Sequence, residues 1–246
     1  MKSSKPTIGI IGGAGPMAGV CLAKRVVELL QREYCCVEDA DFPRILLLSE
    51  PFCQMLRPHE QGDAAIVDQL ASSLQWLIEA GADLIAIACN TLHAFLPEKS
   101  ERYRQLLHLI KESEESIERK LYRQVLVLGS STAAVKHLYR FKGAVWPSAK
   151  GQDLVNQLIY QILEGRCGDE QQALLRRIVN SELNRVGYLD AVLLGCSELS
   201  VLMRGCVEID LPLIDPLDLM AERLCRGLEE LEMASSLPPL GPLTRD

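Results

Sequence analysis

The chain has 246 residues, which is enough for one large domain or two smaller ones. Hydrophobic residues make up 48% of it and charged residues 24%, as in an ordinary soluble globular protein. The net charge of −7 argues against nucleic acid or an anionic membrane as a partner, but it leaves room for a small anionic substrate. No apolar run approaches the roughly 20 residues that span a bilayer, and the N-terminus lacks the apolar core of a signal peptide. A cytoplasmic protein is therefore expected.

Buried strands and helices are expected to alternate along the first half of the chain. A β-branched run leads into a glycine-rich turn and a helix that starts at Pro16, because proline suits a first helical turn. Two further apolar runs have the length of buried strands, and the segment between them shows helical spacing. The predicted strands are Thr7–Ile11, Arg44–Ser49 and Leu84–Ala88, and the predicted helices cover residues 16–33, 62–80 and 98–120. The last helix is rich in charge and is expected to be exposed.

The pattern restarts in the second half, where an apolar run again leads into a turn. The predicted strands are Gln124–Thr132 with its turn, Gly143–Trp146 and Asp190–Ser200, and the predicted helices cover residues 133–139, 149–164, 169–186 and an amphipathic segment that ends near residue 232. Such alternation is typical of parallel sheets in the α/β class. Right-handed crossovers bring the carboxyl ends of the strands to one edge, where ligands bind, so polar residues at these ends are candidate site residues.

Two strand ends resemble each other in the order of their residues. Gly81–Ala94 and Gly187–Ser200 each begin at glycine, cross an apolar strand, and then reach a small residue, a cysteine and two polar residues. The two cysteines are Cys89 and Cys196, which lie 107 positions apart (196 − 89). The repeat predicts two related lobes that face each other across a cleft, with one cysteine on each wall. A single cysteine at a strand end is more often a core residue, and it is the matched pair that favours a function.

Opposed thiols suit the inversion of a carbon acid. One base removes a proton from one face of the carbon while an acid returns a proton to the other, and a thiolate and a thiol can exchange these roles. The helix N-termini after each cysteine are expected to lower the thiol pKa from about 8.5. The same N–H groups, with nearby amide and hydroxyl groups, are suited to hold a carboxylate and to stabilise its developing charge. The candidate substrate contacts are Gly13, Asn90, Thr91, Ser130, Thr132 and Ser197.

The chain has seven further cysteines, which need a separate interpretation. They should be thiols in a reducing compartment, and no two of the nine have the Cys-x-x-Cys spacing of a metal or redox motif. The four histidines do not cluster with them, so no metal site is expected. Each of the seven is expected to be a small buried hydrophobe. They are Cys21, Cys35, Cys36, Cys53, Cys167, Cys206 and Cys225.

Four segments together resemble a known family. They are "IGIIGGAGPMAG" (Ile8–Gly19), "ACNTLHAF" (Ala88–Phe95), "LLGCSELS" (Leu193–Ser200) and "LPLID" (Leu211–Asp215). In this order, across nearly the whole chain, they resemble the aspartate/glutamate racemase superfamily and are closest to its aspartate racemase branch. The resemblance implies cofactor-independent racemisation of an amino acid by two cysteines, and usually a homodimer. It also implies two lobes: residues 1–97 completed by the C-terminal helix in 214–246, and residues 98–213.

The resemblance assigns roles to residues at matching positions. Cys89 and Cys196 match the acid/base pair, and Asn90 and Thr91 match contacts to the substrate carboxylate. Glu198 matches the acidic residue after the second cysteine, where it is expected to orient its neighbours at a helix start. These assignments rest on the family pattern.

Other positions depart from the family pattern. Ser130 takes the place of a threonine, Gln54 stands where an arginine binds the side-chain carboxylate in aspartate racemases, and Leu163 stands where a lysine is expected. The loss of both cations weakens aspartate as the substrate and leaves room for glutamate or a broader specificity. Arg57, three residues after Gln54, is either a replacement cation or a surface residue.

The sequence leaves several interpretations open. His93 either faces the cleft and tunes the Cys89 thiol, or makes a local structural hydrogen bond. The turn Gly13–Ala18 fits the dinucleotide-binding pattern G-x-G-x-x-A, but Pro16 occupies the turn and the acids that follow do not end a strand. The same fold could also belong to a different carbon-acid isomerase, to a decarboxylase, or to a non-catalytic amino-acid-binding or regulatory protein.

Overall fold

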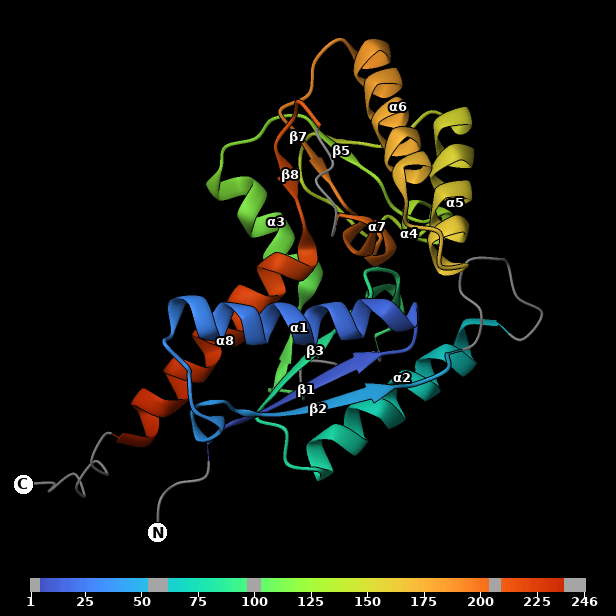
Figure 1. Ribbon diagram of the computed structural model, residues 1–246. Helices are drawn as coiled ribbons and strands as arrows, with labels where there is room; N and C mark the ends of the chain where they lie inside the picture. The colour runs from blue at the N-terminus through green and yellow to red at the C-terminus, as the bar shows by residue number, and fades with distance from the viewer. Residues whose placement is uncertain (1–4, 53–61, 97–102, 204–208, 237–246) are drawn as a thin grey trace, which may run out of the picture.

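The structure is a computed structural model that describes residues 5–52, 62–96, 103–203 and 209–236. Its framework is two four-stranded parallel sheets, which lie one above the other in Figure 1. The first sheet has the order β2 (Arg44–Ser49), β1 (Thr7–Gly12), β3 (Leu84–Ile87) and β4 (Leu106–Leu107). The second has the order β6 (Ala144–Val145), β5 (Val125–Val127), β7 (Ala191–Leu193) and β8 (Leu213–Ile214). The order of strands is the same in both sheets, which confirms the α/β class and agrees with the repeat seen in the sequence.

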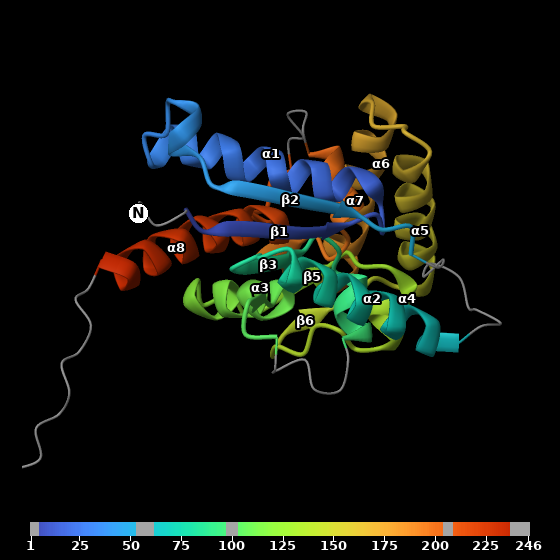
Figure 2. The same ribbon diagram turned by 90° about the horizontal axis from the view of Figure 1, so that it is seen from below.

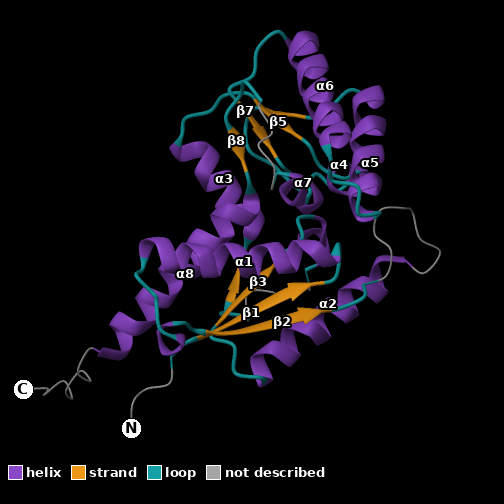
Figure 3. Cartoon of the chain, in the orientation of Figure 1, coloured by secondary structure: helices purple, strands orange, loops and turns teal. Residues whose placement is uncertain are grey.

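Helices follow most strands and cover the sheets (Figure 3). Their bounds are α1 Pro16–Glu33, α2 Gly62–Glu79, α3 Leu109–Arg119, α4 Ser131–Val135, α5 Ala149–Leu163, α6 Asp169–Val186, α7 Ser197–Leu202 and α8 Pro216–Ser236. Two short 3₁₀ helices, η1 (Asp39–Asp41) and η2 (Thr91–Phe95), follow α1 and β3. No helix in these described ranges is long and apolar enough to cross a bilayer.

Helices cover both faces of the first sheet, although its edge strand β2 is only partly buried. α1 lies on one face and α2 on the other, as Figures 1 and 2 show. Successive side chains of a strand point to opposite faces, so Ile10 packs in the cluster that contains Leu22 of α1. Ile11 packs in the second cluster, with Leu70 of α2. Burial on both faces explains why β1 is apolar without alternation.

The C-terminal helix connects the two sheets. It begins directly after β8 of the second sheet and packs against α1 and α3. The pairing of β3 with β4 carries the first sheet past residue 97, to residues 106–107. The division of the chain into residues 1–97 with 214–246 and residues 98–213 stays a prediction.

The prediction of an exposed helix over residues 98–120 was only partly right. Its described part contains β4 and then α3, and one face of α3 packs against α8. Ser113 and Ser116 lie on the buried face, although charge is frequent around them in the sequence. Small serine side chains allow this close packing, while the charged residues occupy the other face. β4 and β8 were not predicted, because a strand of two residues has no periodicity to detect.

Candidate active site

Cys89 and Cys196 occupy equivalent places in the two sheets. Cys89 follows β3, the third strand of the first sheet, and Cys196 follows β7, its counterpart in the second. Both thiols are buried, with 6% and 3% of each residue exposed. They also lie close enough for Cys89 to raise the pKa of Cys196. The matched strand ends therefore bring two buried thiols into one electrostatic environment.

The prediction that helix N-termini lower the pKa of these thiols is wrong for this structure. Burial raises the pKa of Cys89 to about 12, and Glu198 raises it further. The N–H groups of Leu92 and Thr91 act in the predicted direction, but their effect is smaller than that of burial. Burial also raises the pKa of Cys196 well above its usual value, followed by the effect of Glu198. Both groups are thus neutral thiols near neutral pH, because a thiolate loses its hydration in a dry site.

Glu198 joins the second cysteine to the glycine-rich turn of the first sheet. The Cys196 thiol donates a hydrogen bond of 2.8 Å to Glu198 Oε2. On the other side, a Cβ atom placed on Gly15 would lie only 1.8 Å from Glu198 Oε1. Gly15 also has a φ of 80°, in the left-handed region that favours glycine. Burial raises the pKa of the Glu198 carboxyl group, so Glu198 is a buried acid that is placed to exchange a proton with Cys196.

Two hydrogen bonds link the residues after Cys89 to loop residues that connect the elements around the second sheet. The hydroxyl groups of Thr91 and Ser130 lie 2.9 Å apart. The Tyr139 hydroxyl group donates to Asn90 Oδ1 at 2.5 Å. The candidate residues at the end of β3 are therefore in direct contact with the turn after β5 and with the segment after α4.

Two polar atoms near the cysteines are buried and lack a hydrogen-bond partner in the described part of the chain. They are Asn90 Nδ2 and Ser197 Oγ, one beside each cysteine in the sequence. Buried polar groups are nearly always satisfied in native proteins, so an unsatisfied pair at one site needs an explanation. Ser197 also lies close enough to Glu198 to lower the pKa of that carboxyl group, so Asn90 Nδ2 is the donor with the clearest need of a ligand, and a carboxylate would supply its acceptor.

His93 has the environment of a structural residue. The Leu109 N–H group donates to His93 Nε2 at 3.3 Å, so the proton of the neutral ring lies on Nδ1. Nδ1 then donates to the Cys89 carbonyl oxygen at 2.9 Å. Burial lowers the pKa of His93 to about 3. Both ring nitrogens are used by the backbone, and this favours a structural role for His93 over direct tuning of the thiol.

The remaining candidates have different positions. A Cβ atom on Gly13 would lie 2.0 Å from the Glu50 carbonyl oxygen, so this glycine permits close approach of the chain after β2. Thr132 is half-buried within α4, and Leu163 is an exposed residue at the end of α5. Gln54 and Arg57 lie outside the described residues. The substrate-contact roles of Gly13, Thr132 and Gln54 stay predictions.

Sequence reasoning missed two residues that contact the site. Gly15 was recognised only as part of a glycine-rich turn. Its only signal in the sequence is its place directly before Pro16, and the structure shows that its backbone is left-handed. Tyr139 was predicted inside a helix over residues 133–139, but α4 ends at Val135. The helix ends early because His137 has a left-handed backbone with a φ of 48°. No local pattern marks Tyr139 as a partner of Asn90.

The other described cysteines are not all buried. Cys21 and Cys225 are buried as expected, but Cys35 and Cys167 are exposed and Cys36 is half-buried. Cys35 and Cys167 lie in the segments that follow α1 and α5, where the chain turns at the surface. Cys53 and Cys206 lie outside the described residues. The expectation of burial was therefore wrong for Cys35 and Cys167.

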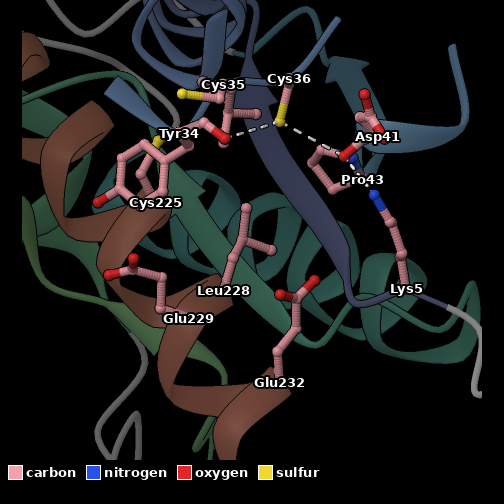
Figure 4. A pocket seen from close by; sticks show the side chains of 11 residues that line it. Lys5, Tyr34, Cys35, Cys36, Asp41, Pro43, Cys225, Leu228, Glu229 and Glu232 are labelled. Carbon is pink, nitrogen blue, oxygen red and sulfur yellow. Dashed lines mark hydrogen bonds between the residues drawn. The ribbon is translucent and has the colours of Figure 1, made fainter. Parts of the chain in front are cut away.

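Three of these cysteines line a pocket of about 370 Å³ (Figure 4). Cys35 and Cys36 contribute from the segment that follows α1, and Cys225 contributes from α8. The pocket also includes Lys5 and Pro43, which precede β1 and β2. It lies at the amino ends of the first-sheet strands, whereas Cys89 lies at a carboxyl end. The described residues contain no group of three or more His, Cys, Asp or Glu side chains suited to a metal ion.

The comparison with known families agrees with this architecture. Residues 11–224 match the sequence pattern of the family described as Asp/Glu/Hydantoin racemase. The chain belongs to this family. The resemblance to the aspartate/glutamate racemase superfamily is thereby confirmed, and so is the expected enzyme class, an isomerase of the amino-acid racemase type.

Individual relatives cover nearly the same length. The broad specificity amino-acid racemase RacX of Bacillus subtilis (strain 168) is 26% identical over 217 residues, which are 85% of this chain and 92% of RacX. The Picrophilus torridus aspartate racemase has a TM-score of 0.70 at 23% identity, covering 91% of this chain and 94% of its own. The Thermus thermophilus glutamate racemase, in complex with β-chloro-D-alanine, has a TM-score of 0.67 at 20% identity, covering 98% and 86%. The two solved structures share the fold of this chain.

Proposed function

We propose that this protein racemises a free amino acid without a cofactor, using Cys89 and Cys196 as acid and base on opposite faces of Cα. The observation that carries the proposal is the pair of buried thiols at equivalent strand ends, where Asn90 and Thr91 beside Cys89 hydrogen-bond to Tyr139 and Ser130 of the second half. A two-base inversion needs one proton acceptor and one proton donor, and two thiols supply both once one of them is ionised.

The proton balance runs through Glu198. The Cys196 thiol transfers its proton to the carboxylate 2.8 Å away, and the resulting thiolate removes the Cα proton of one enantiomer. The Cys89 thiol then donates its proton to the opposite face of the carbanion. This turnover leaves a Cys89 thiolate and a protonated Glu198, and the resting site is restored when the Glu198 proton returns to Cys89 through solvent. The same steps in reverse, starting from the Cys89 thiolate with Glu198 protonated, convert the other enantiomer. Burial makes thiolate formation costly, but the same burial makes a thiolate a stronger base toward the weakly acidic Cα–H bond.

The substrate carboxylate is proposed to bind between the two unsatisfied polar groups. Asn90 Nδ2 is a buried donor without a partner among the described residues, and the buried Ser197 hydroxyl group beside Glu198 makes no hydrogen bond of ordinary geometry there. The backbone N–H groups of Thr91 and Leu92 point toward Cys89, since they lower its pKa. These donors would also stabilise the charge that spreads into the carboxylate when Cα is deprotonated.

We infer a broad side-chain specificity, and not one limited to aspartate. Leu163 stands where the aspartate racemase pattern has a lysine, and it is exposed at the end of α5. Gln54 stands at the position of the arginine. RacX, the relative described as having broad specificity, matches over most of this chain. A cytoplasmic homodimer with two lobes is part of the same proposal.

The test is incubation with single chiral amino acids in heavy water. A two-base racemase gives a product that carries deuterium at Cα from the first turnover, while the remaining substrate keeps its hydrogen. Exchange into substrate and product alike would indicate one base, as in another carbon-acid isomerase or a decarboxylase. No exchange with any standard amino acid would contradict the proposal and favour a non-catalytic binding protein.

Cysteine variants test the mechanism on the same assay. Cys89→Ser and Cys196→Ser should each abolish racemisation without unfolding the protein, because a serine hydroxyl is a far weaker acid than a thiol. Cys225→Ser is the matched control, since Cys225 is also buried but lies in α8. Normal racemisation by either of the first two variants would rule out the two-thiol mechanism.

A further inference from the structure

Tyr139 contacts the segments that carry both cysteines. It follows α4 and is 3% exposed. Its hydroxyl group donates to Asn90 Oδ1, the residue after Cys89. Its ring lies against Gly195, the residue before Cys196, where an added Cβ atom would be 3.3 Å from Tyr139 Cε2. One buried side chain therefore lies between the two strand ends of the site.

The hydrogen bond from Tyr139 to Oδ1 determines which end of the Asn90 amide, the oxygen or the NH₂ group, faces the substrate. An asparagine side chain has one carbonyl oxygen and one NH₂ group, and rotation of the amide by half a turn exchanges them. Because Tyr139 holds Oδ1, the NH₂ group takes the other direction, where it is buried and has no partner among the described residues. The reversed amide would present a carbonyl oxygen there, and an oxygen repels a carboxylate.

We propose that Tyr139 is a positioning residue that fixes the Asn90 amide with its NH₂ group toward the substrate carboxylate. The proposal rests on the function proposed above, in which Asn90 Nδ2 holds that carboxylate. Tyr139 does not touch the substrate and exchanges no proton with it. Its hydroxyl group acts on the substrate through Asn90 and also hydrogen-bonds to Ser113 of α3, and its ring packs beside Gly195.

Tyr139→Phe tests this role, because it keeps the ring and removes the hydroxyl group. Without the donor, the amide is free to present either end, so substrate binding should weaken. We expect KM, or Kd by calorimetry, to rise roughly tenfold, while kcat falls by less. The probe is the amino acid that gives the fastest exchange in the heavy-water series. Tyr122→Phe is the matched control, since Tyr122 also packs against the core but is not part of the site.

A double-variant cycle separates positioning from general support of the fold. Asn90→Ala removes the amide that Tyr139 acts on, so adding Tyr139→Phe to it should have no further effect on KM or Kd. If Tyr139 had only a structural role, Tyr139→Phe would weaken substrate binding equally in the unmodified protein and in the Asn90→Ala background, and Tm would fall in parallel. An unchanged KM in Tyr139→Phe, or an equal loss in the Asn90→Ala background, would overturn the proposal.

The same experiments distinguish this proposal from the proposed function. If the protein binds an amino acid but does not racemise it, the two-thiol mechanism fails, while a Kd change in Tyr139→Phe that is absent in the Asn90→Ala background still supports the positioning role. If racemisation proceeds and Tyr139→Phe behaves as the unmodified protein does, only the positioning role fails. If no amino acid binds at all, both fail.

Discussion

The Cys196 thiol donates its hydrogen bond to the Glu198 carboxylate, two residues further on in the first turn of α7. Both residues are buried, so the carboxylate has two opposite effects on the thiol. As a negative charge it raises the pKa of Cys196, after the larger effect of burial. As the hydrogen-bond acceptor it provides a destination for the thiol proton. In the proposed mechanism, Cys196 keeps its proton in the resting site and becomes a thiolate only when that proton passes to Glu198.

The first prediction concerns this transfer. Glu198→Gln keeps the shape of the side chain but cannot accept the Cys196 proton. Racemisation should fall by roughly 10²- to 10³-fold, as expected for loss of a general base. The loss in kcat/KM, measured at low substrate concentration, should be equal in both directions, because the two enantiomers have equal free energy. Initial rates by polarimetry from each pure enantiomer measure it.

The control for this change is Glu118→Gln, on the exposed face of α3. It should leave the rate unchanged. If Glu198→Gln retained more than about a third of the activity, the carboxylate would not be the proton acceptor that the mechanism requires.

A second prediction follows from the contact between Gly15 and Glu198. In Gly15→Ala the new methyl group would occupy the place of Glu198 Oε1, so the carboxylate must move away from Cys196. Activity should fall nearly as far as in Glu198→Gln, and the double variant should be no worse than either single one. Stability should also fall by about 1 kcal/mol, because alanine is strained at positive φ.

Gly81→Ala is the matched control for the backbone strain. Gly81 has a φ of 85°, but a Cβ atom there would meet nothing within 4 Å. In urea unfolding, Gly81→Ala should lose about as much stability as Gly15→Ala, but it should keep full activity. Equal activities of the two alanine variants would show that the Glu198 position is not set by Gly15.

Six of the eight strands in the described residues, and the two cysteines, could be predicted from the sequence, because buried parallel strands are continuous apolar runs. Val125–Val127 and Ala191–Leu193 are completely buried, and each lies within a segment predicted as a strand. The equivalence of Cys89 and Cys196 was visible for the same reason, since polar residues stand out where such runs end.

The environment of the thiols could not be predicted in the same way. The sequence indicates that a helix begins after each cysteine, and this alone lowers a thiol pKa. It does not show how completely the two halves exclude water, and burial outweighs the N–H groups at Cys89. The contact of Tyr139 with Asn90 joins residues 49 positions apart and has no local signal either.

A third prediction uses the buried His93 as a source of pH dependence. Its folded pKa of about 3 lies below the ordinary value of 6.5. As pH falls through 6.5 the unfolded chain binds a proton that the folded protein does not bind, so the stabilisation present above that pH is progressively lost toward pH 3. Its share of the free energy of unfolding should fall by about 1.4 kcal/mol between about pH 7.5 and about pH 5.5.

His93→Gln should remove that share, because glutamine does not titrate. Urea unfolding of both proteins at several pH values gives the comparison. The result is the slope of the unfolding free energy against pH, and the absolute stability of each protein does not affect it. His108, whose pKa burial also lowers, packs against His93 with the ring centroids 4.8 Å apart, so both proteins are compared in a His108→Gln background. Parallel curves would contradict a buried neutral His93.

The last prediction concerns Arg25, which ties α1 to the start of α8. Its guanidinium donates to Asp215 Oδ2 at 2.8 Å and to the Ser200 carbonyl oxygen at 2.9 Å. The side chains of Arg25 and Asp215 are only 17% and 10% exposed. Arg25→Met leaves the Asp215 carboxylate buried without its cation, so unfolding free energy should fall by about 3 kcal/mol. Lys24→Met is the control, because Lys24 pairs with Glu28 on the exposed surface and should change stability by about 0.5 kcal/mol or less.

A second substitution identifies the cause of the loss. Asp215→Asn added to Arg25→Met should recover part of the stability, because it removes the uncompensated charge. The Ser200 hydroxyl group and the Leu217 N–H group, which both donate to Asp215 Oδ1, remain to satisfy the amide oxygen. Equal losses in Arg25→Met and Lys24→Met would instead mean that the connection between α1 and α8 depends on apolar packing, and not on this ion pair.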